Sequence, residues 1–287
     1  MSRRTTPCTG GCRTPWPRST RPELARRARL DAELVRRGLA RSGEQAPTLI
    51  AAGRVRVAGT VATKPATGVD AATALLVDEP EGEQWVSRGA HKLLGALAAF
   101  DLEVTGVRAL DAGASTGGFT DVLLRRGAAH VVAVDVGYGL LDWSLRTDER
   151  VTVVERVNAR ALEPEQVGAP VDLVVADLSF IPLGLVLPAL VRCARTGADL
   201  LPMVKPQFEV GREQLPSGGV VRDPAARAGA VRRVAEQAGE LGLGVRGVVA
   251  SPLPGPSGNV EFFLWLQAGA PPLVEDELQR AIHEGPA

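Results

Sequence analysis

Residues 107–120 read VRALDAGASTGGFT, and this stretch decides the fold. An apolar run ends in Asp111, a turn with three glycines follows, and Phe119 opens a segment with helical spacing. Glycine lets a backbone turn sharply and approach a ligand closely. In sheets of parallel strands, ligands bind at the carboxyl ends of the strands. The stretch therefore predicts a strand–turn–helix unit with a ligand site in its turn.

The sequence on either side of this turn alternates between apolar runs and amphipathic segments. We expect strands at 107–111, 130–135, 151–155, 172–176, 199–204, 244–251 and 260–267, and helices at 88–99, 119–126, 182–194 and 224–241. Such alternation predicts an α/β fold with a doubly wound, mostly parallel sheet that is covered on both faces. The last two strands would add an antiparallel edge.

The N-terminal part of the chain has a different composition. Residues 1–24 are rich in Arg, Pro and Thr, which predicts a disordered basic tail. Residues 25–80 predict a small α+β module with two helices and a hairpin that turns at Ala58-Gly59. The expected order continues with a linker at 81–86, the α/β domain at 87–270 and a C-terminal tail at 271–287.

Charge is divided unevenly although the net charge is zero. Residues 1–64 hold 14 Arg and Lys against 4 Asp and Glu, whereas the remainder holds 19 against 29. A basic N-terminal segment followed by an acidic remainder is typical of a protein whose N-terminal module binds a polyanion, most simply nucleic acid. A solubilising tail is the alternative.

Other features exclude several classes of protein. The three cysteines, Cys8, Cys12 and Cys193, form neither a disulfide framework nor a metal-ligand set. We therefore expect no metal. The N-terminus has no apolar signal core, so we also expect a cytoplasmic protein. The apolar stretch 173–191 contains a charge and two prolines, which argues against a membrane span.

Glycine spacing in the turn distinguishes two cofactor classes. Hydride-transfer enzymes show G-x-G-x-x-G, whereas here the pattern is Gly113-x-x-x-Gly117-Gly118. The next strand ends in Asp135, which suits the hydroxyls of a ribose. Together these features resemble motif I of methyltransferases that use S-adenosylmethionine. A purely structural strand–helix turn is the alternative.

Four charged residues lie where the expected topology would gather them. Asp177 and Lys205 end strands, Glu261 opens the final strand, and Lys92 lies on the helix before the first strand. Methyl transfer to an alcohol needs a base, and lysine can be one because it loses its proton far more readily than arginine. The chain holds 30 Arg and only three Lys. The set therefore fits O-methylation, although a surface ion pair is the simpler interpretation of each residue alone.

Other methyl acceptors fit less well. Methylation of exocyclic amines favours a Pro-Pro-aromatic sequence where this chain has Leu178-Ser179-Phe180. Methylation of cytosine carbon needs a nucleophilic cysteine near the cofactor, and Cys193 lies in the middle of an expected helix.

From about Ala25 to Ala268 the chain resembles the TlyA family, also known as haemolysin A. The stretches that carry the resemblance are RRARLDAELVRRGLARS, WVSRGAHKL, LDAGASTGGFT, VVADLSFI, VKPQFEVG and SPLPGPSGNVEFFLW. The resemblance implies an N-terminal S-four-type RNA-binding domain and an FtsJ-like methyltransferase domain. It also implies methylation of cytidine 2′-hydroxyls in small- and large-subunit ribosomal RNA, with S-adenosylmethionine as cofactor and ribosomal subunits as partners.

Residue by residue, the family's K-D-K-E tetrad falls on Lys92, Asp177, Lys205 and Glu261. Lys205 would be the base, Lys92 would assist it and contact RNA, and the two carboxylates would orient the group. The implied cofactor site comprises Asp111, Gly113, Ala114, Ser115, Thr116, Gly117, Gly118, Phe119, Asp135, Val136 and Asn158. The arginines expected to bind RNA are Arg26, Arg27, Arg29, Arg36, Arg37 and Arg88.

The chain departs from the family pattern at Gly43, Pro47 and Ala58, all in the RNA-binding module. Two other functions remain open at this point. A non-catalytic RNA-binding protein would keep the module and lose the cofactor, and a membrane-lytic haemolysin would need an amphipathic or spanning segment.

Overall fold

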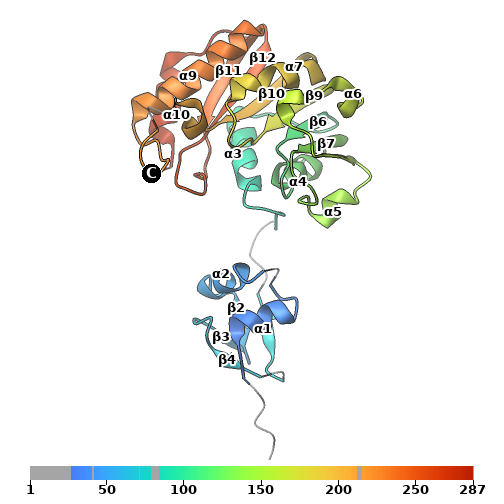
Figure 1. The fold of residues 1–287 in the computed structure, drawn as a ribbon, viewed down its shortest axis with the longest axis vertical. Coiled ribbons are helices and arrows are strands. Elements are labelled where there is room, and N and C mark those ends of the chain that lie inside the picture. Colours follow the sequence, from blue (N-terminus) through green and yellow to red (C-terminus); the bar gives the residue numbers. More distant parts are fainter. Residues whose placement is uncertain (1–26, 41, 71, 79–83, 212–214, 287) are drawn as a thin grey trace, which may run out of the picture. The chain divides into compact units, whose positions relative to one another are not determined.

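The computed structural model describes residues 27–40, 42–70, 72–78, 84–211 and 215–286 (Figure 1). The expected tail at 1–24, Arg26, Cys8, Cys12 and part of the expected linker lie outside these residues. The chain divides into two compact units, Met1–Gln84 and Trp85–Ala287.

The N-terminal unit is a small α+β fold. Its elements are β1 (Ala28–Arg29), α1 (Leu30–Arg36), α2 (Gln45–Ala51), β2 (Val55–Val57), β3 (Thr60–Val61), β4 (Gly68–Val69) and β5 (Leu75–Val77). β1 pairs with β4, and β2 lies between β3 and β5, all antiparallel. Leu30, Leu34 and Ile50 form the buried core with their neighbours. Pro47 falls in the first turn of α2, where a backbone N–H has no helical partner to lose.

The predicted hairpin is present between β2 and β3. Ala58 and Gly59 both have positive φ, 48° and 85°. Positive φ at both central residues is the geometry of the turn that matches the twist of paired strands.

The C-terminal unit is built on a seven-stranded sheet in the order β11-β12-β10-β9-β6-β7-β8. The strands are β6 (Arg108–Ala112), β7 (His130–Asp135), β8 (Val151–Glu155), β9 (Val171–Ala176), β10 (Ala194–Val204), β11 (Leu243–Ala250) and β12 (Phe262–Ala268). The five strands from β10 to β8 are parallel, and β12 is antiparallel to both β10 and β11. The predicted parallel sheet with an antiparallel edge is confirmed.

Helices cover both faces of this sheet (Figure 1). They are α3 (Ala90–Phe100), α4 (Gly118–Arg125), α5 (Trp143–Arg146), α6 (Pro164–Val167), α7 (Leu187–Cys193), α8 (Pro206–Glu209), α9 (Pro224–Glu240) and α10 (Glu275–Glu284), with 3₁₀ turns η1 (Ala159–Ala161) and η2 (Leu183–Leu185). Neighbouring strand residues point to opposite faces. Leu110 accordingly packs in a core with α7, α9 and α10, whereas Ala109 packs in another with α3 and α4.

The prediction of a C-terminal tail at 271–287 is wrong. This segment contains α10, whose Leu278, Ala281 and Ile282 are buried in the core beside α9 and β11. Their helical spacing is that of a buried stripe. Four acidic residues in 275–284 conceal that stripe in the composition.

Candidate active site

The four charged residues singled out in the sequence lie in one cluster. Lys205 Nζ is 2.6 Å from Asp177 Oδ1, and Lys92 Nζ is 3.9 Å from Asp177 Oδ2. Lys92 Nζ also donates a hydrogen bond of 2.6 Å to Glu261 Oε2. The four side chains form one chain of contacts with two positive and two negative charges.

Strand topology explains why three of these residues meet. Asp177 follows β9 and Lys205 follows β10, so both lie at the carboxyl edge of parallel neighbours. β12 runs antiparallel, with Phe262 paired to Val204, so its first residues lie at that same edge. Glu261 is thereby placed next to Lys205. Lys92 reaches the cluster from the first turn of α3.

The cluster is largely buried. The exposed fraction of the side chain is 11% for Lys92, 8% for Lys205 and 1% for Glu261. A buried charge is costly unless it is paired, and even a paired one contributes little to stability compared with an apolar substitute. The arrangement therefore holds four charged groups at fixed positions at an energetic cost, which is typical of a functional site.

Two further residues contact or flank Lys205, and the sequence reasoning did not select them. Lys205 Nζ donates a hydrogen bond of 2.9 Å to Ser179 Oγ. Phe180 is 91% exposed, has φ +63°, and its ring lies 5.1 Å from the ring of Phe208. Exposed phenylalanine in the left-handed region is unusual, because burial and backbone preference both oppose it. The only signal in the sequence was their position directly after a strand that ends in Asp177.

The glycine turn packs against this cluster. A Cβ on Gly113 would lie 2.6 Å from the backbone oxygen of Asp177, and Gly113 has φ +88°. Any side chain there would push the turn away from the end of β9. Gly113 thus keeps the turn and the charged cluster adjacent.

A cavity of about 400 Å³ opens beside the turn. Of the expected cofactor residues, those that line it are Gly113, Ser115, Asp135, Val136 and Asn158. Leu178 and Ile181 add apolar surface. The start of α4 instead buries Gly117, Gly118 and Phe119, which form part of the turn but do not line the cavity. Ala114 is also buried, and Thr116 is exposed outside this cavity.

A second cavity, of about 950 Å³, lies on the other side of the loop that follows β9. Lys205 and Glu261 line it together with Gln207 and Phe208. Ser179 and Phe180 line both cavities. Asp177 lines the first cavity and Lys205 the second, so their ion pair lies where the two meet.

The first cavity is acidic. Asp135 accepts hydrogen bonds from the backbone N–H groups of Ser115 and Gly137, at 2.8 and 2.7 Å. Burial raises the pKa of Asp111 to about 7, a hydrogen bond from Thr120 opposes this, and the Asp177 carboxylate raises it further. Asp111 Oδ1 is buried and has no hydrogen-bond partner among the described residues. Asp111 does not line the cavity, whereas Asp135 and Asp177 do, and a ligand with positive charge and a ribose matches these two carboxylates.

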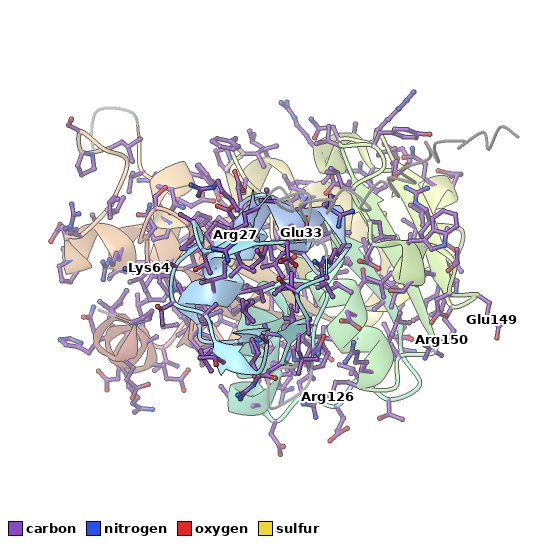
Figure 2. All side chains as sticks on the ribbon, turned by 90° about the horizontal axis from the view of Figure 1, so that it is seen from below. Arg27, Glu33, Lys64, Arg126, Glu149 and Arg150 are labelled. Atoms are coloured by element: carbon purple, nitrogen blue, oxygen red, sulfur yellow. The ribbon has the colours of Figure 1, made fainter. Side chains whose placement is uncertain are left out.

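The expected RNA-binding arginines differ in their surroundings, and Arg27 is labelled in Figure 2. Arg27 on the N-terminal unit and Arg88 before α3 are exposed. The side chains of Arg29 and Arg36 are 61% and 63% exposed while pairing with Asp31 and Glu33. These four guanidinium groups remain accessible to a phosphate.

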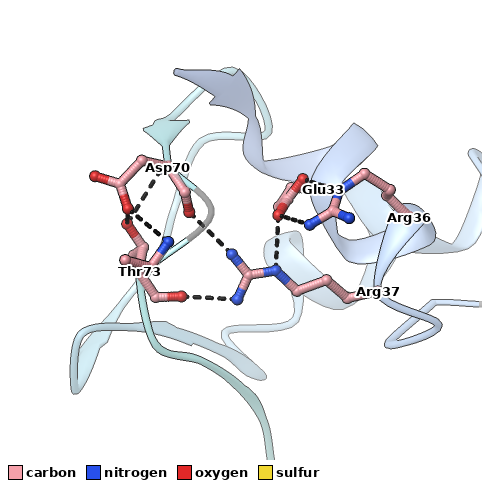
Figure 3. A network of polar contacts seen from close by, with 6 residues as sticks. Glu33, Arg36, Arg37, Asp70 and Thr73 are labelled. Atoms are coloured by element: carbon pink, nitrogen blue, oxygen red, sulfur yellow. Dashed lines mark hydrogen bonds and ion pairs between the residues drawn. The ribbon is translucent and has the colours of Figure 1, made fainter. Parts of the chain in front are cut away.

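Arg37 differs from these four arginines because its guanidinium is bonded within the N-terminal unit. Its guanidinium donates to Glu33 and to the backbone oxygens of Thr73 and Asp70, at 2.7, 2.8 and 2.9 Å (Figure 3). Hydrogen bonds from Arg36 and then Arg37 lower the pKa of Glu33 to about 2. Arg37 therefore ties α1 to the loop before β5, and its role in RNA binding stays a prediction.

Within the described residues no group of three or more His, Cys, Asp or Glu side chains could hold a metal ion. No helix there is both long and apolar enough to cross a membrane.

Comparison with known proteins identifies both units. Residues 85–268 match the FtsJ-like methyltransferase family, and residues 28–73 match the S4 domain. The 16S/23S rRNA (cytidine-2′-O)-methyltransferase TlyA of Mycobacterium tuberculosis is 64% identical, over 92% of this chain and 100% of that protein. Hemolysin A of Brachyspira hyodysenteriae is 33% identical, over 82% of this chain and 97% of that protein.

A solved structure agrees with this assignment. A protein of Streptococcus thermophilus that carries the name hemolysin superimposes with a TM-score of 0.71 at 38% identity, covering 91% of this chain and 96% of that one. The chain thus belongs to the FtsJ-like methyltransferases and, within them, to the TlyA family.

Proposed function

We propose that this protein transfers a methyl group from S-adenosylmethionine to the 2′-hydroxyl of a cytidine in ribosomal RNA. One observation carries the proposal: the amine of Lys205 is held by Asp177 and Ser179 where two cavities meet. The name of the Mycobacterium tuberculosis relative, which is 64% identical, supports the same reaction.

The first cavity suits S-adenosylmethionine. Asp135 at the end of β7 has the position and the acceptor oxygens to bind ribose hydroxyls, and Gly113 allows close approach. The Asp135 and Asp177 carboxylates, which line this cavity, favour a cation over an anion. When bound, this cofactor supplies an electrophilic methyl group on a positively charged sulfur.

Lys205 would act as the general base. A ribose hydroxyl in the second cavity gives its proton to Lys205 Nζ while its oxygen forms the new bond to carbon. The Asp177 carboxylate forms an ion pair with the resulting ammonium, and the same carboxylate also lies close to the second cation, Lys92. Glu261 holds Lys92 in place. A positioned base of this kind contributes roughly 10²–10⁴-fold to a rate.

The basic N-terminal unit would bind the RNA. Arg27, Arg29 and Arg36 offer accessible guanidinium groups for phosphates, and Arg88 does so on the catalytic unit. Phosphate contacts of this kind supply affinity that falls with salt. A ribosomal substrate implies a cytoplasmic protein.

The test uses ribosomal subunits from a bacterial strain that lacks this gene. Purified protein and tritiated S-adenosylmethionine are incubated with each subunit separately, and mass mapping locates the methyl group. We expect a mass increase on a cytidine ribose in at least one subunit. Cofactor binding by calorimetry without methylation of either subunit would instead indicate a non-catalytic RNA-binding protein.

A further inference from the structure

Lys205 has one ion-pair partner and one hydrogen-bond partner, and both come from one loop. Asp177 Oδ1 lies 2.6 Å from Nζ, and Ser179 Oγ lies 2.9 Å from it. Both residues belong to the segment that leaves β9, and they are separated only by Leu178. The loop thus contacts the amine through two different groups, a carboxylate and a hydroxyl.

Two partners restrict the amine more than one can. A lysine ammonium has three N–H donors around a tetrahedral nitrogen, and the neutral amine has two N–H donors and one lone pair. With Asp177 alone, the amine could still rotate about the Cε–Nζ bond. With Ser179 accepting one N–H and the Asp177 carboxylate holding the nitrogen as an ion pair, this rotation is restricted, and in the neutral amine the lone pair takes a preferred direction.

We propose that Ser179 is a positioning residue that directs the Lys205 lone pair toward the substrate hydroxyl. The inference rests on the proposed function, because it assigns a role within the same reaction. The proton passes from the ribose oxygen to Lys205 Nζ, and the oxygen pair forms the O–C bond as the C–S bond breaks toward sulfur. Ser179 keeps its own proton and accepts a hydrogen bond before and after the transfer.

The surroundings of Ser179 favour this role over a structural one. The residue is exposed, and within the described ranges the only hydrogen bond of its hydroxyl is the one from Lys205. It belongs to neither hydrophobic core, so loss of its hydroxyl leaves no buried void. It also lines both cavities, as the geometry of the reaction requires.

The experiment compares Ser179→Ala with Ser179→Thr, which restores the hydroxyl and adds a methyl group at an exposed site. Ser144→Ala is the matched control, because its hydroxyl donates a 2.7 Å hydrogen bond to a carboxylate, that of Asp142, on α5 outside both cavities. Measurements are kcat and KM on unmodified ribosomal subunits and the Kd for S-adenosylmethionine by calorimetry.

We expect Ser179→Ala to lower kcat about tenfold, which is the loss of one hydrogen bond to a charged group. KM and cofactor Kd should stay within about twofold, Ser179→Thr should recover most of kcat, and Ser144→Ala should match the wild type. An unchanged kcat in Ser179→Ala overturns the inference. So does a parallel change in kcat, KM and Kd that threonine does not rescue, because it would show a structural role.

The wild-type protein separates this inference from the proposed function. If the wild type methylates no ribosomal subunit, the proposed function fails before Ser179 is tested. If the wild type is active and Ser179→Ala is equally active, only the inference fails.

Discussion

The carboxylate of Asp177 lies 2.6 Å from the amine of Lys205 and 3.9 Å from that of Lys92. One carboxylate therefore contacts two cations unequally, and the nearer cation faces the second cavity. Glu261 holds the farther lysine at 2.6 Å. From this unequal arrangement we propose different roles for the two lysines: Lys205 exchanges a proton, and Lys92 balances charge.

Lys205→Arg should abolish methylation while the protein folds and binds cofactor. Arginine keeps the charge and a similar length, but it does not release its proton at neutral pH. We expect a fall in single-turnover rate of about 10²–10⁴-fold, with an unchanged Kd for S-adenosylmethionine. Lys64→Arg, an exposed lysine of the N-terminal unit, is the control. Near-normal activity of Lys205→Arg would remove Lys205 as the base.

The Lys92–Glu261 pair should show strong coupling in a double-mutant cycle. Glu261 is 1% exposed, so Glu261→Leu leaves the ammonium of Lys92 buried with only the distant Asp177. Each single change, Glu261→Leu or Lys92→Met, should cost about 3–5 kcal/mol of unfolding free energy. The double variant should cost less than the sum by about 1–3 kcal/mol. Urea unfolding measures all four proteins, and additive costs would refute the coupling.

Phe180 should contribute to RNA binding and not to stability. It is 91% exposed at the junction of the two cavities, so its ring can stack on a nucleobase. Phe180→Leu keeps an apolar side chain but removes the flat face, and we expect KM for the ribosomal subunit to rise about tenfold. Phe180→Trp keeps a flat face and should stay near the wild-type KM. Equal KM values for both variants would exclude stacking.

Arg37→Met should destabilise the N-terminal unit, whereas Arg36→Met should not. Arg37 ties α1 to the backbone of residues 70 and 73, and its side chain is only 21% exposed. We expect the unfolding midpoint of that unit to fall by roughly 5–10 °C. Arg36→Met should mainly weaken RNA binding at low salt. Hydrogen exchange of residues 30–77 in the full chain reports the difference, and equal protection in both variants would contradict it.

The sequence predicted the sheet and the charged cluster better than the loops between them. Buried parallel strands are continuous apolar runs, so β7 and β8 occupy the predicted residues. Asp177 and Lys205 could be selected because strand ends of a parallel sheet meet at one edge. Ser179 and Phe180 could not, because their roles depend on how the loop after β9 turns. Arg37 resembles its neighbours in sequence, and its partners lie 33 and 36 residues away.

Asp111 should make stability fall as pH rises. Burial raises the folded-state pKa of Asp111 from 3.8 to about 7, so between these values the folded protein holds a proton that the unfolded chain has released. The protonated Asp111 thus contributes to the unfolding free energy fully below pH 3.8. This contribution to stability declines as the pH rises to about 7, and above pH 7 it no longer changes. Its upper bound is about 4 kcal/mol.

Asp111→Asn removes this titration while keeping a side chain of the same shape beside Thr120. We therefore expect the wild type to lose more unfolding free energy between pH 5 and pH 8 than Asp111→Asn does, as measured by urea unfolding without cofactor. Saturating S-adenosylmethionine should reduce the difference, because a cation in the nearby cavity, next to Asp135 and Asp177, favours the ionised carboxylate of Asp111. Identical pH profiles for the two proteins would show that Asp111 is already ionised in the folded state at pH 5.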